Sequence, residues 1–278
     1  MNESLTEKSI FSLRNKVALV TGSQGLLGRQ HCYALAEAGA HVLVTDLDCK
    51  GCEELAISLT DEYHVLSLGC QCEITDRVSI LRAKEYILDE FGRIDILVNN
   101  AAINDMVEAG AGSAEMMKFE NFPLESWNRS LTVNITGTFL CCQILGTAMM
   151  EQGFGSIINI ASTYAVVAPD QSLYANPDGT QDFYKSPAYP TTKGAVLALT
   201  RYLASYWGKK GVRVNALSPG GVKNGQNEPF VEKYSSRTPL GRMAYPSDYK
   251  GAVVFLASDA SKYMTGANLV VDGGWTIW

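Results

Sequence analysis

The chain has 278 residues, of which 46% are hydrophobic, and a formal net charge of −6. This length suffices for one large core, so a separate substrate domain is not required. The acidic balance argues against a continuous basic surface for nucleic acid or an anionic membrane. The first residues are polar, and no later run of about 18 apolar residues occurs. We therefore expect no export signal and no membrane span, and we predict a cytoplasmic location.

Short continuous apolar runs alternate with helical patterns along the chain. Such runs predict parallel strands covered on both faces by helices, which means one doubly wound α/β sheet within a single domain, 1–278. The seven predicted strands span 17–21, 41–46, 64–68, 94–99, 156–161, 212–217 and 268–272. The predicted helices span 26–38, 50–61, 75–91, 124–152, 188–209 and 246–258.

Three long segments interrupt this alternation, at 101–123, 163–187 and 219–245. Each follows a predicted strand at its carboxyl end, which is the edge of an open parallel sheet where ligands bind. Long loops on that edge are more often functional than decorative. We therefore predict that these three segments form the substrate site.

A glycine-rich turn at 21–28 joins the first predicted strand to the first predicted helix. Gly22 permits the tight turn, Gly25 lets the backbone approach a pyrophosphate, and Gly28 lets the helix pack close to the strand. A glycine triplet alone is weak evidence for a nucleotide site. Its position between a strand and a helix predicts a dinucleotide-binding Rossmann fold.

Asp46 closes the second predicted strand, about 20 residues beyond the turn. A carboxylate there hydrogen-bonds the adenosine ribose hydroxyls and repels a 2′-phosphate. No Arg or Lys lies within 23–27 to offset that repulsion, so NAD is favoured over NADP. Arg29 is the one nearby cation that would weaken this preference.

Tyr189 and Lys193 are four residues apart on the helix predicted from 188, so their side chains share one face. Hydride transfer at a carbon–oxygen group needs a proton donor or acceptor, and a cation beside a phenol makes its ionised form accessible. Tyr206 and Lys210 have the same spacing. Tyr206, however, lies about 25 Å further along the helix, so only Tyr189 is expected to reach the cofactor.

Ser162 ends the predicted strand 156–161 at the same edge, where its hydroxyl can hold the reacting oxygen. Together these motifs resemble the short-chain dehydrogenase/reductase family over nearly the whole chain. The matching residues, in order, are Thr21 to Gly28, Asn99 to Ala102, Asn134, Ser162, Tyr189 with Lys193, Ser218 to Gly220 and Val271 to Gly274. The resemblance implies an NAD-dependent oxidoreductase that acts on CH–OH donors and interconverts a secondary alcohol and a ketone.

The resemblance also implies a role for each matching residue. Ser162 would orient the substrate oxygen, Tyr189 would exchange the proton, and Lys193 would bind the nicotinamide ribose and favour the phenolate. Asn134 would hold a water that relays the proton. The implied cofactor contacts, besides Gly22, Gly25, Gly28 and Asp46, are Ser23, Leu27, Leu47, Glu73, Ile74, Asn100, Ala101, Tyr189, Lys193, Pro219, Gly220 and Val222.

Three features depart from the pattern of the family. Leu26 occupies the usual place of the central glycine, and Ala102 replaces a glycine after the paired asparagines. In addition, 26 residues separate Ser162 from Tyr189, where the family has about half as many. Thr163 and Ser186 are therefore alternatives to Ser162.

The segment 163–187 contains four aromatic residues, Tyr164, Tyr174, Phe183 and Tyr184, and aromatic faces suit a sugar or nucleobase ring. The segment 219–245 adds three cations that could pair with phosphate or carboxylate, namely Lys223, Arg237 and Arg242. Our hypothesis is a polar substrate such as a nucleotide-linked sugar. A weaker resemblance to dehydrogenases of flagellin and surface-glycan sugar modification agrees with it. In the plainer interpretation, the aromatic residues only pack the insert and the cations form a solvated rim.

Two rival functions use the same fold. One is a catalytically silent dinucleotide sensor, which is expected to lack the tyrosine or the lysine. The other is an NADPH-linked 3-ketoacyl reductase, which Asp46 disfavours. Binding of NAD without turnover would support the first, and tighter NADPH binding would support the second.

Family members usually form homotetramers through helices that correspond to 124–152 and 188–209, so we expect a tetramer or dimer. The apolar residues 275–278 suit either a second contact between subunits or packing on their own subunit.

Seven cysteines without an export signal indicate reduced thiols. Cys49, Cys52, Cys70 and Cys72 approach a zinc-binding spacing, but the second pair has only one intervening residue. We predict buried thiols and no metal.

Overall fold

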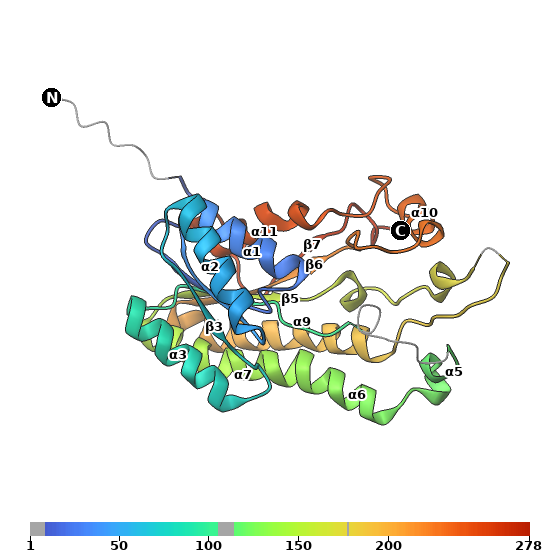
Figure 1. Cartoon of the computed structure of the whole chain (residues 1–278), viewed down its shortest axis with the longest axis horizontal. Coiled ribbons are helices and arrows are strands. Elements are labelled where there is room, and N and C mark those ends of the chain that lie inside the picture. The colour runs from blue at the N-terminus through green and yellow to red at the C-terminus, as the bar shows by residue number, and fades with distance from the viewer. Residues whose placement is uncertain (1–8, 105–113, 177) are drawn as a thin grey trace.

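The centre of the protein is a parallel sheet of seven strands in the order β3-β2-β1-β4-β5-β6-β7, covered by helices on both faces (Figure 1). The computed structural model describes residues 9–104, 114–176 and 178–278. The strands are β1 (Val17–Thr21), β2 (His41–Asp46), β3 (Ser67–Gln71), β4 (Ile96–Asn99), β5 (Gly155–Ile160), β6 (Val212–Pro219) and β7 (Asn268–Val271). The predicted doubly wound fold is confirmed.

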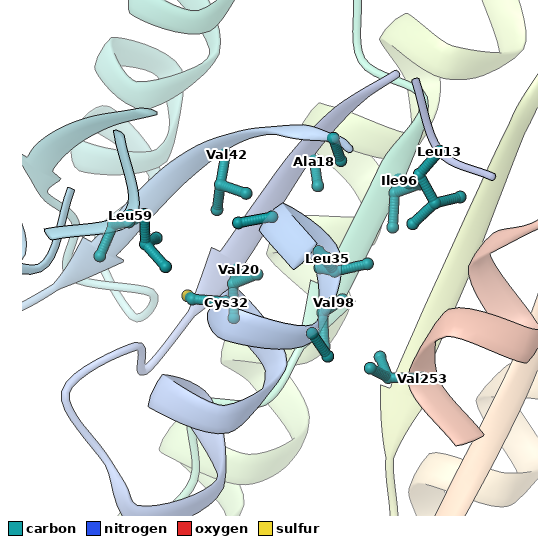
Figure 2. Packing of buried hydrophobic residues seen from close by; sticks show 14 of the residues in the cluster. Leu13, Ala18, Val20, Cys32, Leu35, Val42, Leu59, Ile96, Val98 and Val253 are labelled. Atoms are coloured by element: carbon teal, nitrogen blue, oxygen red, sulfur yellow. The ribbon is translucent and has the colours of Figure 1, made fainter. Parts of the chain in front are cut away.

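The apolar runs form strands because each strand is buried on both faces. All five residues of β1 are buried, and alternate side chains enter two different clusters. Ala18 and Val20 face helices α1 (Leu26–Glu37) and α11 (Lys250–Ala257), as Figure 2 shows for part of this cluster. Val17 and Leu19 face the opposite layer.

The opposite layer contains a continuous helix, 124–152, and the helix α9 (Ala188–Trp207) beside it (Figure 1). The first consists of α6 (Leu124–Leu131), α7 (Thr138–Cys141) and α8 (Thr147–Gln152), joined by π-helical turns at Thr132–Gly137 and Cys142–Gly146. Within the described part of the chain, only this helix is long and apolar enough to cross a membrane. Half of its apolar window is buried within the fold, as in a core helix.

The remaining helices are α2 (Cys49–Tyr63), α3 (Arg77–Phe91), α5 (Ala114–Met117) and α10 (Glu228–Ser236). The strand order reverses between β1 and β4, where successive connections leave in opposite directions. Such a switch point opens a crevice beyond the carboxyl ends of the strands, which is where a parallel sheet binds its ligand. The glycine-rich turn and the segment after β4 both lie there.

Several predicted boundaries were wrong by one to three residues, most clearly at β3, which was predicted at 64–68. Helix α2 continues to Tyr63, and His64 then ends it in the left-handed conformation with φ of 55°. The chain becomes extended only at Ser67, whose amide donates to Thr60 Oγ1 at 3.1 Å.

The sequence interpretation missed helix α10, which lies inside the predicted loop 219–245. A signal was present, because Asn227 Oδ1 accepts from the amide of Phe230 at 2.9 Å and Pro229 lies in the first turn. The predicted helix 246–258 also differs at its start, because 246–249 form a 3₁₀ turn and α11 begins only at Lys250. Part of the predicted loop 101–123 lies outside the described residues.

Candidate active site

A cavity of about 800 Å³ lies at the carboxyl edge of the sheet. Its walls come from the glycine-rich turn, the ends of β2, β4, β5 and β6, the segment 163–187 and the start of α9. Of the predicted site residues it is lined by Gly22, Gly25, Leu27, Asp46, Leu47, Glu73, Ile74, Asn100, Ala101, Ser162, Tyr189, Lys193, Pro219, Gly220 and Val222. Ser23, Gly28 and Asn134 lie behind this wall.

The glycine-rich turn is shaped as a cradle for phosphate groups. Gly22 has a φ of +64°, and a Cβ there would lie 2.6 Å from Ala101 Cα. A Cβ on Gly28 would lie 2.1 Å from Gly22 O, so this glycine lets α1 pack on the turn. A Cβ on Gly25 would meet only Gly22 O, at 3.2 Å, and would otherwise occupy the space at the N-terminus of α1. These residues fit a bound dinucleotide, with its pyrophosphate at the helix N-terminus.

Asp46 braces the turn at the adenosine end of the cavity. Its carboxylate accepts from the amides of Gln24, at 2.8 Å, and Leu47, at 2.7 Å, while it still lines the cavity. Arg29 does not line the cavity, and its guanidinium donates to Gln24 Oε1 at 2.8 Å.

Ser23 was predicted to contact the cofactor, but its side chain points into the fold. The residue is fully buried, and its hydroxyl donates to Val20 O at 2.7 Å and accepts from the amide of Thr45 at 3.1 Å. The amide of Ser23 donates to Thr45 O. Ser23 therefore fixes the turn to β2 from behind.

Asn100 ties the end of β4 to the same turn. Its Nδ2 donates to Thr21 O and Gly22 O, at 3.1 and 2.9 Å. The amides of Asn100 and Ala101 both donate to Thr21 Oγ1 at 3.1 Å. Further along the wall, Glu73 accepts from the amide and the hydroxyl of Thr75.

Tyr189 and Lys193 come together in the first turns of α9. Lys193 Nζ lies 5.8 Å from the centroid of the Tyr189 ring and donates to Ile160 O, at the end of β5, at 2.7 Å. Burial lowers the pKa of Lys193 to about 8. The rival Tyr206 is 66% exposed and stacks on Tyr202, so it has no part in the cavity.

Ser162 and Thr163 both line the cavity, and Ser186 does not. Ser162 Oγ accepts from the amide of Tyr164 at 3.1 Å, which starts a short 3₁₀ turn. Ser186 is fully buried, and its hydroxyl accepts from the amide of Tyr189 at 3.4 Å. The long insert therefore leaves Ser162 at the cavity wall, and Ser186 is excluded as its substitute.

Asn134 lies in the first π-helical turn, where its amide is engaged by protein groups. Its Oδ1 accepts from the amide of Ile103 at 2.8 Å, and its Nδ2 donates to Ile103 O and Thr192 Oγ1, both at 3.1 Å. The side chain thus connects the segment after β4 to Thr192 of α9, the residue just before Lys193.

Comparison with known proteins agrees with this geometry. The family profile described as Enoyl-(Acyl carrier protein) reductase matches residues 23–276. A D-threitol dehydrogenase from Mycolicibacterium smegmatis is 38% identical over 272 residues, covering 96% of this chain and 95% of that protein. The chain belongs to the short-chain dehydrogenase/reductase family.

Two other members of the family support the same assignment. An NAD-dependent glycerol dehydrogenase from Listeria innocua is 31% identical over 272 residues, 96% of each chain. The crystal structure of a gluconate 5-dehydrogenase from Burkholderia cenocepacia, in complex with NADP and tartrate, superposes with a TM-score of 0.85 at 30% identity, covering 98% of this chain and 99% of that one. As a short-chain dehydrogenase/reductase, the chain is an oxidoreductase that interconverts an alcohol and a carbonyl with a nicotinamide dinucleotide.

Most aromatic side chains of the insert pack against other side chains and do not line the cavity. Tyr174 stacks on Phe230 of α10 at 5.3 Å and contacts the ring of Phe183 at 5.2 Å. Only Tyr164, of the four predicted, lines the main cavity, and its hydroxyl is 3.0 Å from that of Tyr174. For Tyr174 and Phe183 the plainer interpretation, packing of the insert, agrees with the structure. Tyr184 instead lies near Lys118, whose Nζ is 6.0 Å from the centroid of its ring.

The three predicted cations do not line the cavity. Arg237 pairs with Asp170 of the insert, and Arg242 pairs with Asp248 at 2.6 Å. The cavity instead contains Arg129 and Lys185, which the sequence interpretation missed. Lys185 lies four residues before Tyr189, but spacing alone could not show on which side of the insert its ammonium lies.

The cysteine cluster forms no metal site within the described residues, where no group of three or more His, Cys, Asp or Glu side chains could hold an ion. All seven cysteines are free thiols, and five are buried as predicted. The prediction was wrong for Cys49, which is exposed, and for Cys70, which is only partly buried. Burial raises the pKa of Cys72 to about 12, which disfavours the thiolate that a metal needs.

Proposed function

We propose that this dehydrogenase uses NAD to oxidise a secondary hydroxyl of a small polyol or sugar, and to reduce the ketone in reverse. The observation that carries the proposal is the placement of Tyr189, Lys193 and Ser162 on one cavity whose far end holds Asp46. The related enzymes named for threitol and glycerol support a polyhydroxylated substrate. A nucleotide-linked sugar, suggested by the insert, stays a prediction.

In this proposal the protein's own groups position the oxygen and move the proton. Ser162 donates a hydrogen bond to the substrate oxygen, and Tyr189 takes the hydroxyl proton during oxidation and returns it during reduction. Lys193 stabilises the phenolate and binds the nicotinamide ribose, while Asn134 keeps α9 in register with the segment after β4. A nicotinamide dinucleotide, when bound, supplies the hydride chemistry.

The preference for NAD rests on Asp46. Its carboxylate lines the adenosine end, where a 2′-phosphate would add a second negative charge, and Arg29 is engaged with Gln24. The glycerol relative is named NAD-dependent, whereas the gluconate dehydrogenase structure contains NADP. Relatives thus differ in their coenzyme, and in this chain Asp46 favours NAD over NADP.

We further propose that the enzyme works in the cytoplasm as a homotetramer. Exposed aromatic side chains lie on both candidate interface helices: Tyr202 and Tyr206 on α9 are 63% and 66% exposed, and Phe139 on α7 is 43% exposed. The C-terminal Trp275 instead stacks on Tyr234 of its own subunit at 5.3 Å. Light scattering of the purified protein tests the oligomeric state.

The function is tested by following NADH formation with threitol, glycerol and sugar nucleotides as separate substrates. We expect turnover of at least one, and a loss of about 10²- to 10⁴-fold in Tyr189→Phe with NAD binding retained. Tyr206→Phe is the matched control and should keep the rate. NAD binding without turnover of any alcohol would support the silent sensor, and preferential use of NADPH on 3-ketoacyl substrates would support the reductase.

A further inference from the structure

A second ammonium group lies at the proposed catalytic tyrosine. Lys185 Nζ is 4.3 Å from the centroid of the Tyr189 ring, closer than Lys193 Nζ at 5.8 Å. The same Nζ donates to Asn104 Oδ1 in the segment after β4. Lys185 lines the cavity although the residue is only 3% exposed. A buried lysine at this place is part of the reaction chamber, not of the solvated rim.

The insert fixes the position of Lys185 through its backbone. Gln171 Oε1 accepts from the Lys185 amide, and Gln171 Nε2 donates to Lys185 O, both at 2.9 Å. One side-chain amide therefore holds both the backbone N–H and the backbone carbonyl of Lys185. Gln181 Nε2 in turn donates to Gln171 O at 3.1 Å. These contacts hold the last part of the insert so that Lys185 lies at the tyrosine.

Two cations therefore face one phenol. The negative charge of a phenolate is shared between its oxygen and its ring. An ammonium over the ring face therefore also stabilises the phenolate, in addition to an ammonium beside the oxygen. We propose that Lys185 is a positioning residue that stabilises the phenolate of Tyr189, as a second cation besides Lys193. The proposal rests on the proposed function, in which Tyr189 exchanges the proton.

Among the described residues, the other ionisable groups near Tyr189 do not place a cation on its ring. Tyr174 and Tyr164 lie on the insert side, and burial raises the pKa of Tyr164, so it is a neutral neighbour. Arg129 of α6 also lines the cavity, but no contact between it and the Tyr189 ring is seen among the described residues. The acidic residues among the described lining, Asp46 and Glu73, belong to the adenosine end.

Lys193 alone gives limited support at alkaline pH, where alcohol oxidation is favoured because a proton is released. Burial lowers the pKa of Lys193 to about 8, so its charge falls above that pH. Under this proposal a positive charge at Lys185 offsets the loss, so Lys185 is expected to matter most in the oxidative direction.

The experiment measures the ionisation of Tyr189 directly. Tyrosinate absorbance is titrated in the NAD-bound enzyme, and the titration of Tyr189→Phe is subtracted to leave the signal of Tyr189. In Lys185→Met we expect the midpoint to rise by about one pH unit, with NAD affinity unchanged. The pH midpoint of kcat/KM for oxidation should move the same way. Lys185→Arg, which keeps the charge, should restore both midpoints.

Two further variants keep the result interpretable. Lys185→Gln keeps a donor for Asn104 without the charge and should shift the midpoint as Lys185→Met does. Lys233→Met is the matched control: Lys233 Nζ donates to Ser172 O and Ala175 O of the insert, so this change loosens the insert without removing a charge from Tyr189. Its midpoint should stay at the wild-type value.

Three outcomes would overturn the role of Lys185: an unchanged midpoint in both neutral variants, an equal shift in Lys233→Met, or no recovery in Lys185→Arg. Failure of the proposed function looks different, because the wild-type enzyme would then turn over no alcohol while the absorbance titration still reports on Tyr189.

Discussion

Asn134 Nδ2 donates to Thr192 Oγ1 at 3.1 Å, and this contact joins the π-helical turn to the helix that carries Tyr189 and Lys193. The hydroxyl of Thr192 donates in turn to Tyr189 O at 2.8 Å. A chain of hydrogen bonds therefore runs from Ile103 through Asn134 to the backbone of the tyrosine. The geometry of the catalytic turn depends on an amide that lies outside the cavity.

Replacing Asn134 by alanine should weaken both folding and catalysis. The change removes this partner from the amide and carbonyl of the half-buried Ile103 and from the buried hydroxyl of Thr192, at a cost of about 2–4 kcal/mol in unfolding free energy. Urea unfolding and kcat measure the two effects. Asn128→Ala, an exposed asparagine on the same helix, is the control and should change neither. A fully stable, fully active Asn134→Ala would contradict the role given to this amide.

Lys193→Met should make the apoprotein more stable at neutral pH while abolishing turnover. Burial lowers the pKa of Lys193 from 10.5 to about 8, so below pH 8 the folded state carries the penalty of a desolvated ammonium. The penalty disappears as the pH rises from about 8 towards 10.5, where the unfolded chain also loses its proton. The gain is at most about 3 kcal/mol at pH 7, and Tm measured across this range should show it shrinking. A variant less stable than wild type at pH 7 would argue against the burial penalty.

His31→Leu should protect the protein from acid. His31 is fully buried, neither ring nitrogen has a hydrogen-bond partner among the described residues, and burial lowers its pKa from 6.5 to about 4. The unfolded chain therefore binds a proton below pH 6.5 that the folded chain does not, and stability falls as the pH drops towards 4 by up to about 3 kcal/mol.

Urea unfolding at pH 7 and pH 5 compares the two proteins, and the variant should lose less stability between them. The exposed His64 is the control, changed to asparagine because that residue tolerates the left-handed conformation. An identical pH dependence in wild type and His31→Leu would show that another group governs acid unfolding.

Asp46→Ala should relax the choice of coenzyme. The change removes a negative charge from the adenosine end and two hydrogen bonds that brace the turn, so NAD should bind more weakly while NADP binding improves. A shift of about tenfold in the ratio of the two KM values corresponds to about 1.4 kcal/mol. Asp48→Ala is the matched control, because Asp48 caps α2 without lining the cavity. An unchanged ratio in Asp46→Ala would assign the preference to another residue.

Most of the dinucleotide half could be predicted from the sequence because local rules decide it. The bounds of β1 and β2 were predicted as they occur, and the glycine-rich turn has the predicted shape, because these glycines meet neighbouring backbone atoms. The direction of the Ser23 side chain, which points into the fold, could not be predicted, since a hydroxyl next to a glycine can face either side of a turn.

The substrate half was harder to predict because side-chain contacts far apart in sequence decide it. The path of the insert depends on Gln171 holding Lys185, and on Asp170 meeting Arg237 about 67 residues later. Composition predicted aromatic and cationic residues at the substrate, but most of the residues named for that role pack the insert or form ion pairs outside the cavity. It could not indicate which of them turn inward, so Lys185 and Arg129 were missed.

The insert and α10 come from two distant parts of the chain, pack against each other and both contribute to the cavity wall. Tyr174 lies flat against Phe230, and Asp170 pairs with Arg237, so neither half can swing away alone without breaking both contacts. The positions of the insert and of α10 are therefore coupled, so a substitution at either contact also affects the segment on the other side of it.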